Sequence, residues 1–315
     1  MPRHVLITGG AGFIGGHLGA ALAARGDVVV ALDNLSTGLR SNVSPGVELV
    51  LGDARDPELV DRLVDRADIV YHLASAVGVR LVVSQPVETI ENSVGCASVV
   101  LKAAAAHGVR FVLASSSEVY GKRSAGLFAE TDDIQLGAPT RPRWAYACSK
   151  ALDEWLAMAW HAQVGLPVVI ARLFNTVGPR QRADFGMVLP SFVLKARAGE
   201  PLLVHGDGSQ TRTFTHVADC VEGLLRLGDD LSIDGEIVNV GGFEELSMLA
   251  LAHRVVAATG SDSPVRLLPY DEAFGPDFED MLRRVPDVGK LKRLTGFVPR
   301  YDIDRIIADV LAQTD

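Results

Sequence analysis

The sequence predicts an α/β protein with a doubly wound parallel sheet and a smaller C-terminal lobe. Two observations predict the sheet: short apolar, β-branched runs alternate with alanine-rich stretches of helical length, and a glycine-rich turn joins the first run to the first stretch. A third observation predicts the lobe, because the composition becomes richer in Gly, Pro and Arg from Pro179 onward. With 315 residues the chain is long enough for one large α/β domain and a smaller lobe.

Composition and charge argue against some classes of binding partner. A hydrophobic content of 48% with 6% aromatic residues is typical of a globular core. The formal net charge of −9 argues against nucleic acid and anionic membranes as partners. Cys96, Cys148 and Cys220 are odd in number and lack metal-ligand spacing, so we expect a reducing, cytoplasmic location and no metal site. We expect neither a signal peptide nor a membrane-spanning run.

The first βα unit carries the pattern of a dinucleotide-binding turn. An apolar strand is predicted at His4–Thr8, and the helix that follows ends near Arg25. Between them Gly9, Gly12 and Gly15 have a spacing that allows a tight turn, close approach of a pyrophosphate and close packing of helix on strand. The helix N-terminus offers free N–H groups and positive dipole to the phosphates. The cofactor contacts expected here are Gly9, Gly12, Phe13, Ile14 and Gly15.

The second strand, predicted at Asp27–Leu32, ends in an acid. Asp33 stands where a carboxylate chelates the adenosine ribose hydroxyls, and an acid there disfavours a 2′-phosphate. We therefore expect NAD rather than NADP, held by a Rossmann domain. Further contacts with the cofactor are expected from Asn34, Ser36, Thr37 and Gly38.

The third strand, predicted at Val47–Leu51, ends in a second acid. Asp53 either meets the adenine amino group or caps the helix that Pro57 begins. Its neighbour Ala54 is expected to lie against the same cofactor.

A fourth strand, predicted at Ile69–Leu73, is followed by small residues that would let the cofactor lie against the backbone. His72 is expected to be a satisfied buried histidine. On the next helix, at about Glu91–His107, Asn92 either anchors the helix start or holds a water near the tyrosine described below. The cofactor contacts expected from this region are Leu73, Ala74, Ser75 and Asn92.

The central strand and the helix after it carry the candidate chemistry. The strand is predicted at Val109–Leu113, so the serines that follow it lie at the sheet edge where ligands bind in open α/β folds. Tyr146 and Lys150 are four residues apart on a helix and hence on one face. A fixed ammonium favours the phenolate, so a lowered pKa is expected for Tyr146. Tyr146 is thus a candidate base, and Ser116 is placed to hydrogen-bond the same substrate oxygen.

The rest of the chain alternates between the two predicted parts. The tyrosine helix continues to Val164, and a strand at Val168–Leu173 leads into the lobe. Further helices are predicted at Leu246–Thr259 and about Asp302–Leu311. We expect a cofactor-binding domain at 1–174 with returning segments at about 213–242, and a lobe at 175–212 and 243–315. The apolar outer positions of the helices at 91–107 and 146–164 are either core or a dimer face.

Taken together these motifs resemble the extended short-chain dehydrogenase/reductase family, specifically its nucleotide-sugar epimerases, decarboxylases and dehydratases. The resemblance covers nearly the whole chain. Its marks are Gly9–Gly15, Asp33, Ser115–Gly121, Tyr146 with Lys150, Asn175, Arg212 and Arg284–Asp287. It implies a tightly held NAD and a homodimer. It also implies a C-terminal lobe that clasps a nucleoside diphosphate sugar, which is expected to be UDP-linked.

The resemblance also implies roles for single residues. Lys150 would hold the nicotinamide ribose, with Ser115 and Leu173 beside the cofactor. Arg212 and Arg284 would contact the diphosphate, although two surface arginines in exposed ion pairs are the alternative. The full set of implied substrate contacts is Ser117, Arg143, Asn175, Val188, Leu189, Arg212, Arg284 and Asp287, with Val188 and Leu189 beside the base.

Glu118 bears on the choice of reaction. A 4-keto sugar formed by Tyr146 can lose CO2 from C5, return hydride to its other face, or lose water. Glu118 and Arg143 resemble the pattern of UDP-glucuronate decarboxylases, and an acid near C5 suits proton transfer there. A 4-epimerase, a dehydratase and a non-catalytic NAD-binding regulator remain alternatives, as do a solvated Glu118 and a loop arginine at Arg143.

Two stretches depart from the decarboxylase pattern. Lys122-Arg123 stands where those enzymes usually continue Asp-Pro, and the segment Tyr270–Leu282 is longer than theirs. The substrate could therefore differ from UDP-glucuronate.

Overall fold

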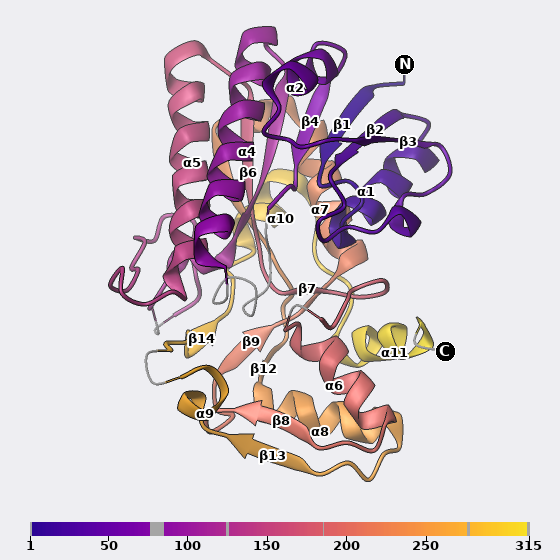
Figure 1. Ribbon diagram of the computed structural model, residues 1–315, viewed down its shortest axis with the longest axis vertical. Helices are drawn as coiled ribbons and strands as arrows, with labels where there is room; N and C mark the ends of the chain where they lie inside the picture. Colours follow the sequence, from indigo (N-terminus) through magenta and orange to yellow (C-terminus); the bar gives the residue numbers. More distant parts are fainter. Residues whose placement is uncertain (1, 76–84, 124–125, 185, 276–277, 314–315) are drawn as a thin grey trace.

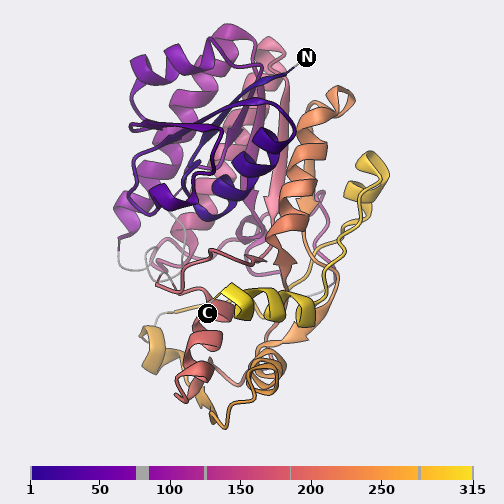
Figure 2. The same cartoon turned by 90° about the vertical axis from the view of Figure 1, so that its right-hand side faces the viewer.

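The computed structural model describes residues 2–75, 85–123, 126–184, 186–275 and 278–313. It contains a large sheet with helices on both faces and a smaller lobe beyond one end of that sheet (Figures 1 and 2). Within the described ranges, no helix is both long enough and apolar enough to cross a membrane.

The sheet has seven parallel strands in the order β11-β6-β5-β4-β1-β2-β3. Its central strands are apolar and almost wholly buried, because helices cover both of their faces. The strand order reverses between β1 and β4, and ligands of open α/β sheets bind at the carboxyl ends beside such a reversal. The strands are β1 His4–Thr8, β2 Val28–Asp33, β3 Val47–Leu51, β4 Ile69–His72, β5 Arg110–Ser116, β6 Val168–Leu173 and β11 Glu236–Val240.

Two apolar cores flank the sheet. The core on one face includes α2 (Pro57–Val64), α4 (Pro86–His107) and α5 (Trp144–Val164). The core on the other face includes α1 (Phe13–Ala24), α7 (Val217–Asp229) and α10 (Gly289–Thr295). Short 3-10 helices lie at η1 (Arg40–Asn42), η2 (Ser117–Tyr120) and η3 (Leu231–Ile233).

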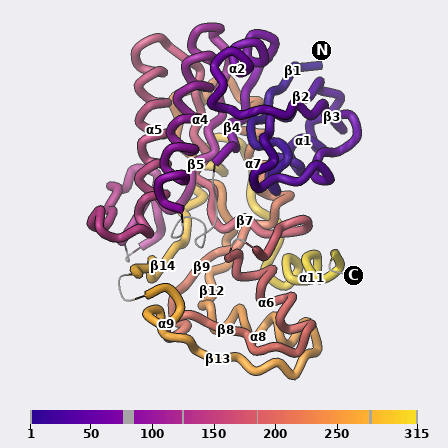
Figure 3. The backbone as a smooth tube through the Cα atoms, in the orientation of Figure 1, coloured from indigo at the N-terminus to yellow at the C-terminus, as the bar shows by residue number. Residues whose placement is uncertain are grey.

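The lobe has its own core, built from three helices and short strands. The carboxyl ends of the sheet face this lobe, and the chain trace passes between the two parts several times (Figure 3). The lobe strands are β7 Thr176–Val177, β8 Leu202–His205, β9 Thr211–Thr213, β10 Thr215–His216, β12 Glu245–Ser247, β13 Val265–Leu268 and β14 Arg283–Arg284. The lobe helices are α6 Val188–Arg197, α8 Met248–Thr259, α9 Tyr270–Phe274 and α11 Ile303–Gln313.

One predicted boundary needs correction. The lobe was expected to take all of residues 243–315, but Leu291 and Phe297 are buried in the core of the sheet against α7 and β11. The segment around α10 therefore packs with the large domain. Its contacts are made by apolar side chains far from the sheet strands in sequence, so no local pattern reveals them.

Two predicted elements also have different ends. Helix α4 begins at Pro86 rather than Glu91, because proline suits the first turn of a helix, where its missing N–H is not needed. Asn92 consequently lies inside the helix and does not anchor its start. Strand β5 continues to Ser116, three residues beyond the predicted Leu113, through pairing with β6.

Candidate active site

The candidate site gathers at the carboxyl ends of β1, β2, β4, β5 and β6, where the sheet faces the lobe (Figure 1). The first part is the turn between β1 and α1. Gly9 has a positive φ of 72°, and a Cβ there would lie 2.8 Å from the backbone nitrogen of Ala74. A Cβ on Gly15 would lie 2.2 Å from the carbonyl oxygen of Gly9. Both positions therefore require glycine, as the sequence predicts.

The same turn fits the diphosphate of NAD. Helix α1 begins at Phe13, and in the described part of the chain no side chain caps the N–H groups of its first turn. No acidic residue lies in that turn either. Phe13 and Ile14 are half-buried in it. Free N–H groups at a positive helix end, reached over a glycine surface, suit an anion.

Asp33 is buried at the end of β2, where the prediction places the ribose. One carboxylate oxygen accepts the N–H of Ala11 at 2.9 Å, and the other accepts the N–H of Leu35 at 2.8 Å. These bonds fix the carboxylate beside the glycine turn. Gly38 packs against both Ala11 and Asp33, and a Cβ there would lie 3.0 Å from either. The other predicted contacts from this loop, Asn34, Ser36 and Thr37, are exposed or half-buried at the same edge.

Asp53 lies at the end of β3 and is not a helix cap. Asp56 is the residue whose side chain caps α2, accepting from the N–H groups of Glu58 and Leu59. Asp53 instead pairs with Arg55 at 2.6 Å, and hydrogen bonds from Arg55 hold the pKa of Asp53 below its usual range. The capping interpretation is wrong, and the adenine contact stays a prediction. Ala54 beside it is buried.

The remaining predicted cofactor contacts line the edge between β4, α4 and β6. Leu73, Ala74 and Ser75 follow β4 and are half-buried, as are Asn92 on α4 and Leu173 at the end of β6. Ser115 differs, because its hydroxyl donates to Glu154 at 2.5 Å and is therefore engaged in the interior. His72 is buried and its Nδ1 contacts the Thr8 hydroxyl at 2.8 Å, while its Nε2 has no hydrogen-bond partner among the described residues.

Tyr146, Lys150 and Ser116 come together as predicted, at the start of α5 and the end of β5. Trp144, Ala147 and Ala151 fix this end of α5 in an apolar cluster with η2, so the tyrosine has a defined place. Ser116 hydrogen-bonds the Tyr146 phenol. The predicted pKa direction is wrong, however. Burial raises the pKa of Tyr146, and this outweighs the lowering by Lys150 and by the Ser116 hydrogen bond.

Lys150 is buried and pairs with Asp153 at 2.9 Å. Burial opposes its charge, but the carboxylate of Asp153 and the nearby Tyr146 raise the pKa of Lys150 above its usual value. Lys150 is thus a fixed cation beside the phenol. Asp153 was not among the predicted site residues.

Glu118 lies in η2 and is buried between two arginines. Arg143 pairs with it at 3.0 Å, and Arg284 of β14 contacts the same oxygen. Burial would raise the pKa of Glu118, yet the two guanidinium groups hold it below its usual value. The alternatives of a solvated Glu118 and a loop arginine at Arg143 are therefore wrong, because both side chains are buried.

A second carboxylate, the half-buried Asp280, joins this group. It pairs with Arg212 of β9 at 3.0 Å and with Arg143 at 3.2 Å. Burial would raise the pKa of Asp280, but the arginines lower it overall. Burial also lowers the pKa of Arg212 to about 10. Arg212 is 6% exposed and is therefore not a surface arginine.

Asn175 and Asp287 have local partners. The amide oxygen of Asn175 accepts from Arg284, and its amide nitrogen donates to the Thr213 carbonyl at 3.0 Å, so Asn175 orients Arg284. One carboxylate oxygen of Asp287 accepts the N–H of Gly289 at 2.7 Å and forms the turn into α10.

The side chains predicted near the base and the sugar are less accessible. Leu189 is fully buried in the lobe core, so only its backbone can reach a base. Val188 is half-buried at the start of α6. Ser117 is buried in η2, next to Glu118.

Asp280 and Asp153 are the functional candidates that sequence reasoning missed. Asp280 lies in the segment Tyr270–Leu282, in which the sequence pattern singled out no individual residue. Asp153 lies three residues after Lys150, a spacing that places both on neighbouring turns of one helix. An acid at that position next to a catalytic lysine was a signal that the sequence offered.

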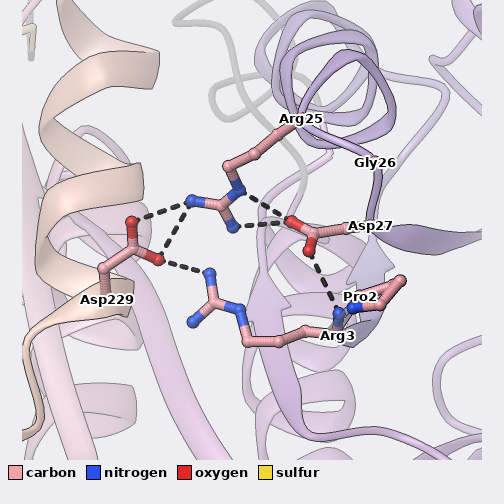
Figure 4. Close-up of a pocket in the computed structure, with 6 residues that line it drawn as sticks. All are labelled: Pro2, Arg3, Arg25, Gly26, Asp27 and Asp229. Atoms are coloured by element: carbon pink, nitrogen blue, oxygen red, sulfur yellow. Dashed lines mark hydrogen bonds and ion pairs between the residues drawn. The ribbon is translucent and has the colours of Figure 1, made fainter.

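A hollow near the N-terminus lies away from this site (Figure 4). Its charged residues pair with one another: Arg25 contacts Asp27 at 2.6 Å and Asp229 at 2.8 Å, and Arg3 contacts Asp229. It lies at the amino ends of β1 and β2, opposite the edge that carries Tyr146. We assign it no ligand.

Comparison with known proteins adds to this geometry. A model of the NAD dependent epimerase/dehydratase family matches residues 5–241. The chain is similar to the UDP-N-acetyl-alpha-D-glucosaminuronate decarboxylase of Bacillus cytotoxicus, with 38% identity over 99% of this chain and 97% of that protein. It is also 38% identical to UDP-glucuronic acid decarboxylase 2 of Arabidopsis thaliana over 95% of this chain, and spans 65% of that longer protein. MoeE5, solved in complex with UDP-glucuronic acid and NAD, has a TM-score of 0.86 and 31% identity, covering 99% of this chain and 98% of that one.

Proposed function

The chain belongs to the NAD-dependent epimerase/dehydratase family, and from this premise we propose that it decarboxylates a UDP-linked sugar acid through a transient 4-ketone. It is an NAD-dependent enzyme, and the specific reaction and substrate are the proposal. A 4-epimerase is the second candidate.

One observation carries the choice of decarboxylation. Glu118 is buried between Arg143 and Arg284, one short turn from Ser116 and hence beside the Tyr146 phenol. Three buried or half-buried arginines against two carboxylates leave this region with excess positive charge, which suits an anionic sugar nucleotide. That both relatives named above are decarboxylases supports the same choice.

The first step is oxidation at C4 of the sugar. Tyr146 takes the proton of the 4-hydroxyl in its phenolate form, which Lys150 favours and burial opposes, while the C4–H bond breaks and its electron pair leaves as hydride. Ser116 hydrogen-bonds the same oxygen, and Lys150 stabilises the phenolate by its charge. NAD, held at the glycine turn and Asp33, would supply the acceptor for that hydride.

The second step follows from the 4-ketone. A carboxylate on C5 is then β to the carbonyl, so the C5–C6 bond breaks, CO2 leaves, and the electron pair moves to the carbonyl oxygen as an enolate. A proton adds to C5, hydride returns to C4, and Tyr146 gives its proton back to the 4-oxygen. The net change is loss of CO2 and gain of one proton.

Arg143 and Glu118 have complementary parts in this step. We propose that the sugar carboxylate takes the place of Glu118 on Arg143. With one counter-ion fewer, Glu118 becomes less acidic and can hold the proton that C5 needs. Arg212, Arg284 and Asn175 would hold the diphosphate.

The two stretches that depart from the decarboxylase pattern contact each other. Lys122 pairs with Glu279 at 2.8 Å, and Glu279 also accepts from the indole N–H of Trp144 at 2.7 Å. Glu279 lies next to Asp280, which reaches the arginines. Through Asp280, the segment Tyr270–Leu282 therefore reaches the arginines that we propose hold the substrate. For this reason the assay below includes an N-acetylated sugar acid beside UDP-glucuronate.

The test is a mass-resolved assay of the purified enzyme with UDP-glucuronate and with UDP-N-acetylglucosaminuronate. A product lighter by one CO2 is expected from at least one of them. An isomer of unchanged mass would replace the proposal with 4-epimerisation. No change with either would reject both sugar acids as substrates.

The location and the assembly are also proposals. The odd cysteine count favours a cytoplasmic location. A homodimer through α4 and α5 is supported by the exposed apolar side chains on these helices, which excludes the alternative that they are core. Its test is given in the Discussion.

A further inference from the structure

A buried chain of polar contacts lies behind Lys150. Its ammonium is 2.9 Å from Oδ2 of Asp153, and the same carboxylate oxygen accepts the hydroxyl of Ser93 at 3.0 Å. Ser93 in turn lies 3.4 Å from the hydroxyl of Ser75, at the end of β4. These contacts connect α5, α4 and the cofactor edge of the sheet. Lys150, Asp153 and Ser93 are each 2% exposed or less.

The carboxylate of Asp153 is not satisfied in the way that a structural ion pair is. Its Oδ1 has no hydrogen-bond partner among the described residues although it is buried. Leaving such an acceptor unpaired lowers the stability of the folded protein. The next residue, Glu154, has both oxygens paired: Oε1 accepts from Arg172 at 2.9 Å and from Ser115, and Oε2 accepts from Arg172 at 2.7 Å. The contacts of Glu154 are those of a structural ion pair, whereas Asp153 keeps one buried oxygen without a partner among the described residues.

We propose that Asp153 is a positioning residue that holds the Lys150 ammonium in place and offsets part of its charge beside Tyr146, with Ser93 orienting Asp153. The proposal rests on the proposed proton transfer by Tyr146 and not on the decarboxylation. It does not depend on which sugar is bound.

The charges give the direction of the effect. Burial raises the pKa of Tyr146, Lys150 and Ser116 lower it, and Glu118 and Asp153 raise it. Removal of the Asp153 charge therefore moves the pKa of Tyr146 down. Burial lowers the pKa of Lys150, and Asp153 is the largest opposing cause. Without Asp153 the lysine loses its proton at a lower pH than in the wild type.

Other titratable groups face this pair and stay in place in the variants. Burial raises the pKa of Cys96 to about 11 and lowers that of His72 to about 3, so both are neutral near pH 7. The groups that face Lys150, Asp153 or Tyr146 are Glu154 from α5, Cys96 from α4, His72 from β4 and Glu118 from η2.

The test titrates tyrosine ionisation by ultraviolet absorbance in the free protein, without sugar. The ionisation step in the absorbance titration that Tyr146→Phe lacks is the ionisation of Tyr146. In Asp153→Asn this step is expected at lower pH by one unit or more, and in Ser93→Ala by less. With an active substrate, the acid limb of the pH profile of kcat/KM is expected to shift the same way, which raises activity about tenfold per unit on that limb. At alkaline pH, kcat/KM of Asp153→Asn is expected to fall again, because Lys150 loses its proton there.

Asp219→Asn is the control for loss of a buried carboxylate. Asp219 is 1% exposed and accepts the N–H groups of Arg300 and Tyr301 at 2.7 and 3.0 Å, away from Tyr146. Its variant is expected to lose stability and keep the Tyr146 step. A step that stays in place in Asp153→Asn and Ser93→Ala, or moves to higher pH, would overturn the proposal. So would an equal shift in Asp219→Asn. Because the titration needs no substrate, failure of the proposed reaction is distinguishable from failure of this inference.

Discussion

Tyr146 is the side chain on which every reaction of this site depends. Replacement by phenylalanine removes the phenol oxygen and keeps the ring that packs at the start of α5. Turnover is expected to fall by at least 10²–10⁴-fold, the contribution of a positioned base. The protein is expected to retain NAD, because Gly9, Gly15 and Asp33 are unchanged. Turnover and cofactor content are measured on the same preparation, and full activity in Tyr146→Phe would refute the mechanism.

Glu118 separates the candidate reactions. In Glu118→Gln the amide keeps the shape of the side chain but removes the charge between Arg143 and Arg284. A decarboxylase is expected to form its decarboxylated product about 10²-fold more slowly, since proton delivery to C5 after CO2 leaves fails. Oxidation at C4 is expected to persist and is followed by the absorbance of reduced NAD. A variant that forms the decarboxylated product at the wild-type rate would contradict a role for Glu118 in proton transfer.

Single residues were predictable where their role follows from local spacing. Tyr146 and Lys150 lie on one helix face, and Ser116 ends the strand beside them, as the pattern requires. The pKa direction of Tyr146 was not predictable, because it depends on burial and on Asp153 and Glu118. Asp280 escaped because its partners, Arg143 and Arg212, are each more than 60 residues away along the chain.

At the scale of elements, the turn between β1 and α1 gives a matched test of the glycine argument. Gly9→Ala is expected to abolish NAD binding, because a Cβ would lie 2.8 Å from the Ala74 backbone at a φ of 72°. Gly108→Ala is the control: its φ is 67°, but nothing lies within 4 Å of its Cβ. The control is expected to lose about 1 kcal/mol of stability and to keep its NAD affinity. Isothermal titration with NAD compares them, and equal loss in both variants would contradict the steric argument.

Strand β4 carries a buried histidine that links stability to pH. Burial lowers the pKa of His72 from its unfolded value of 6.5 to about 3. The unfolded chain therefore binds a proton between these values and the folded chain does not. Above pH 6.5 the titration of His72 leaves the free energy of unfolding unchanged. Between pH 6.5 and about 3 that free energy falls by about 1.4 kcal/mol for each pH unit. His17, His205 and His216 also have lowered pKa values and add to the slope.

His72→Asn isolates the part that belongs to His72. Denaturant unfolding is measured from pH 7 to 5 in the wild type and in the variant. The slope of the free energy of unfolding against pH is expected to be smaller in the variant by one proton. Identical slopes would mean that His72 does not stay neutral in the folded protein.

The elements themselves were largely predictable from apolar runs and glycine turns. Their ends were less so: α4 gains a turn from Pro86, and β5 gains Ser116 from its pairing with β6. The start of α4 at Pro86 follows a local proline rule that the prediction did not apply, whereas the β5 extension depends on a tertiary contact that no local pattern contains. The placement of α10 on the sheet has the same cause, since Leu291 finds its partners on α7 and β11.

At the scale of the whole molecule, α4 and α5 lie side by side on one face of the sheet (Figures 1 and 2). Both helices carry exposed apolar residues, which form an outward-facing stripe. On α5 the exposed residues Cys148, Leu152, Trp155 and Ala159 recur at the spacing of one helix face. Trp155 is 64% exposed and Leu152 is 45% exposed. On α4, Val87 is 66% exposed. An aromatic and aliphatic stripe of this kind is typical of a surface that a partner covers.

We predict that this stripe is the interface of a homodimer. A charge at its centre, in Trp155→Glu, is expected to shift the protein from dimer to monomer, because a carboxylate cannot be buried there without a counter-ion. Leu194→Glu is the control, since Leu194 is 49% exposed on α6 of the lobe and lies outside the stripe. Light scattering across a concentration series measures both. A wild type of monomer mass would contradict the prediction, and so would a Trp155→Glu variant that stays dimeric. Because Tyr146 and Lys150 lie on the same helix as the stripe, loss of the dimer is also expected to lower turnover in Trp155→Glu and to leave it unchanged in Leu194→Glu.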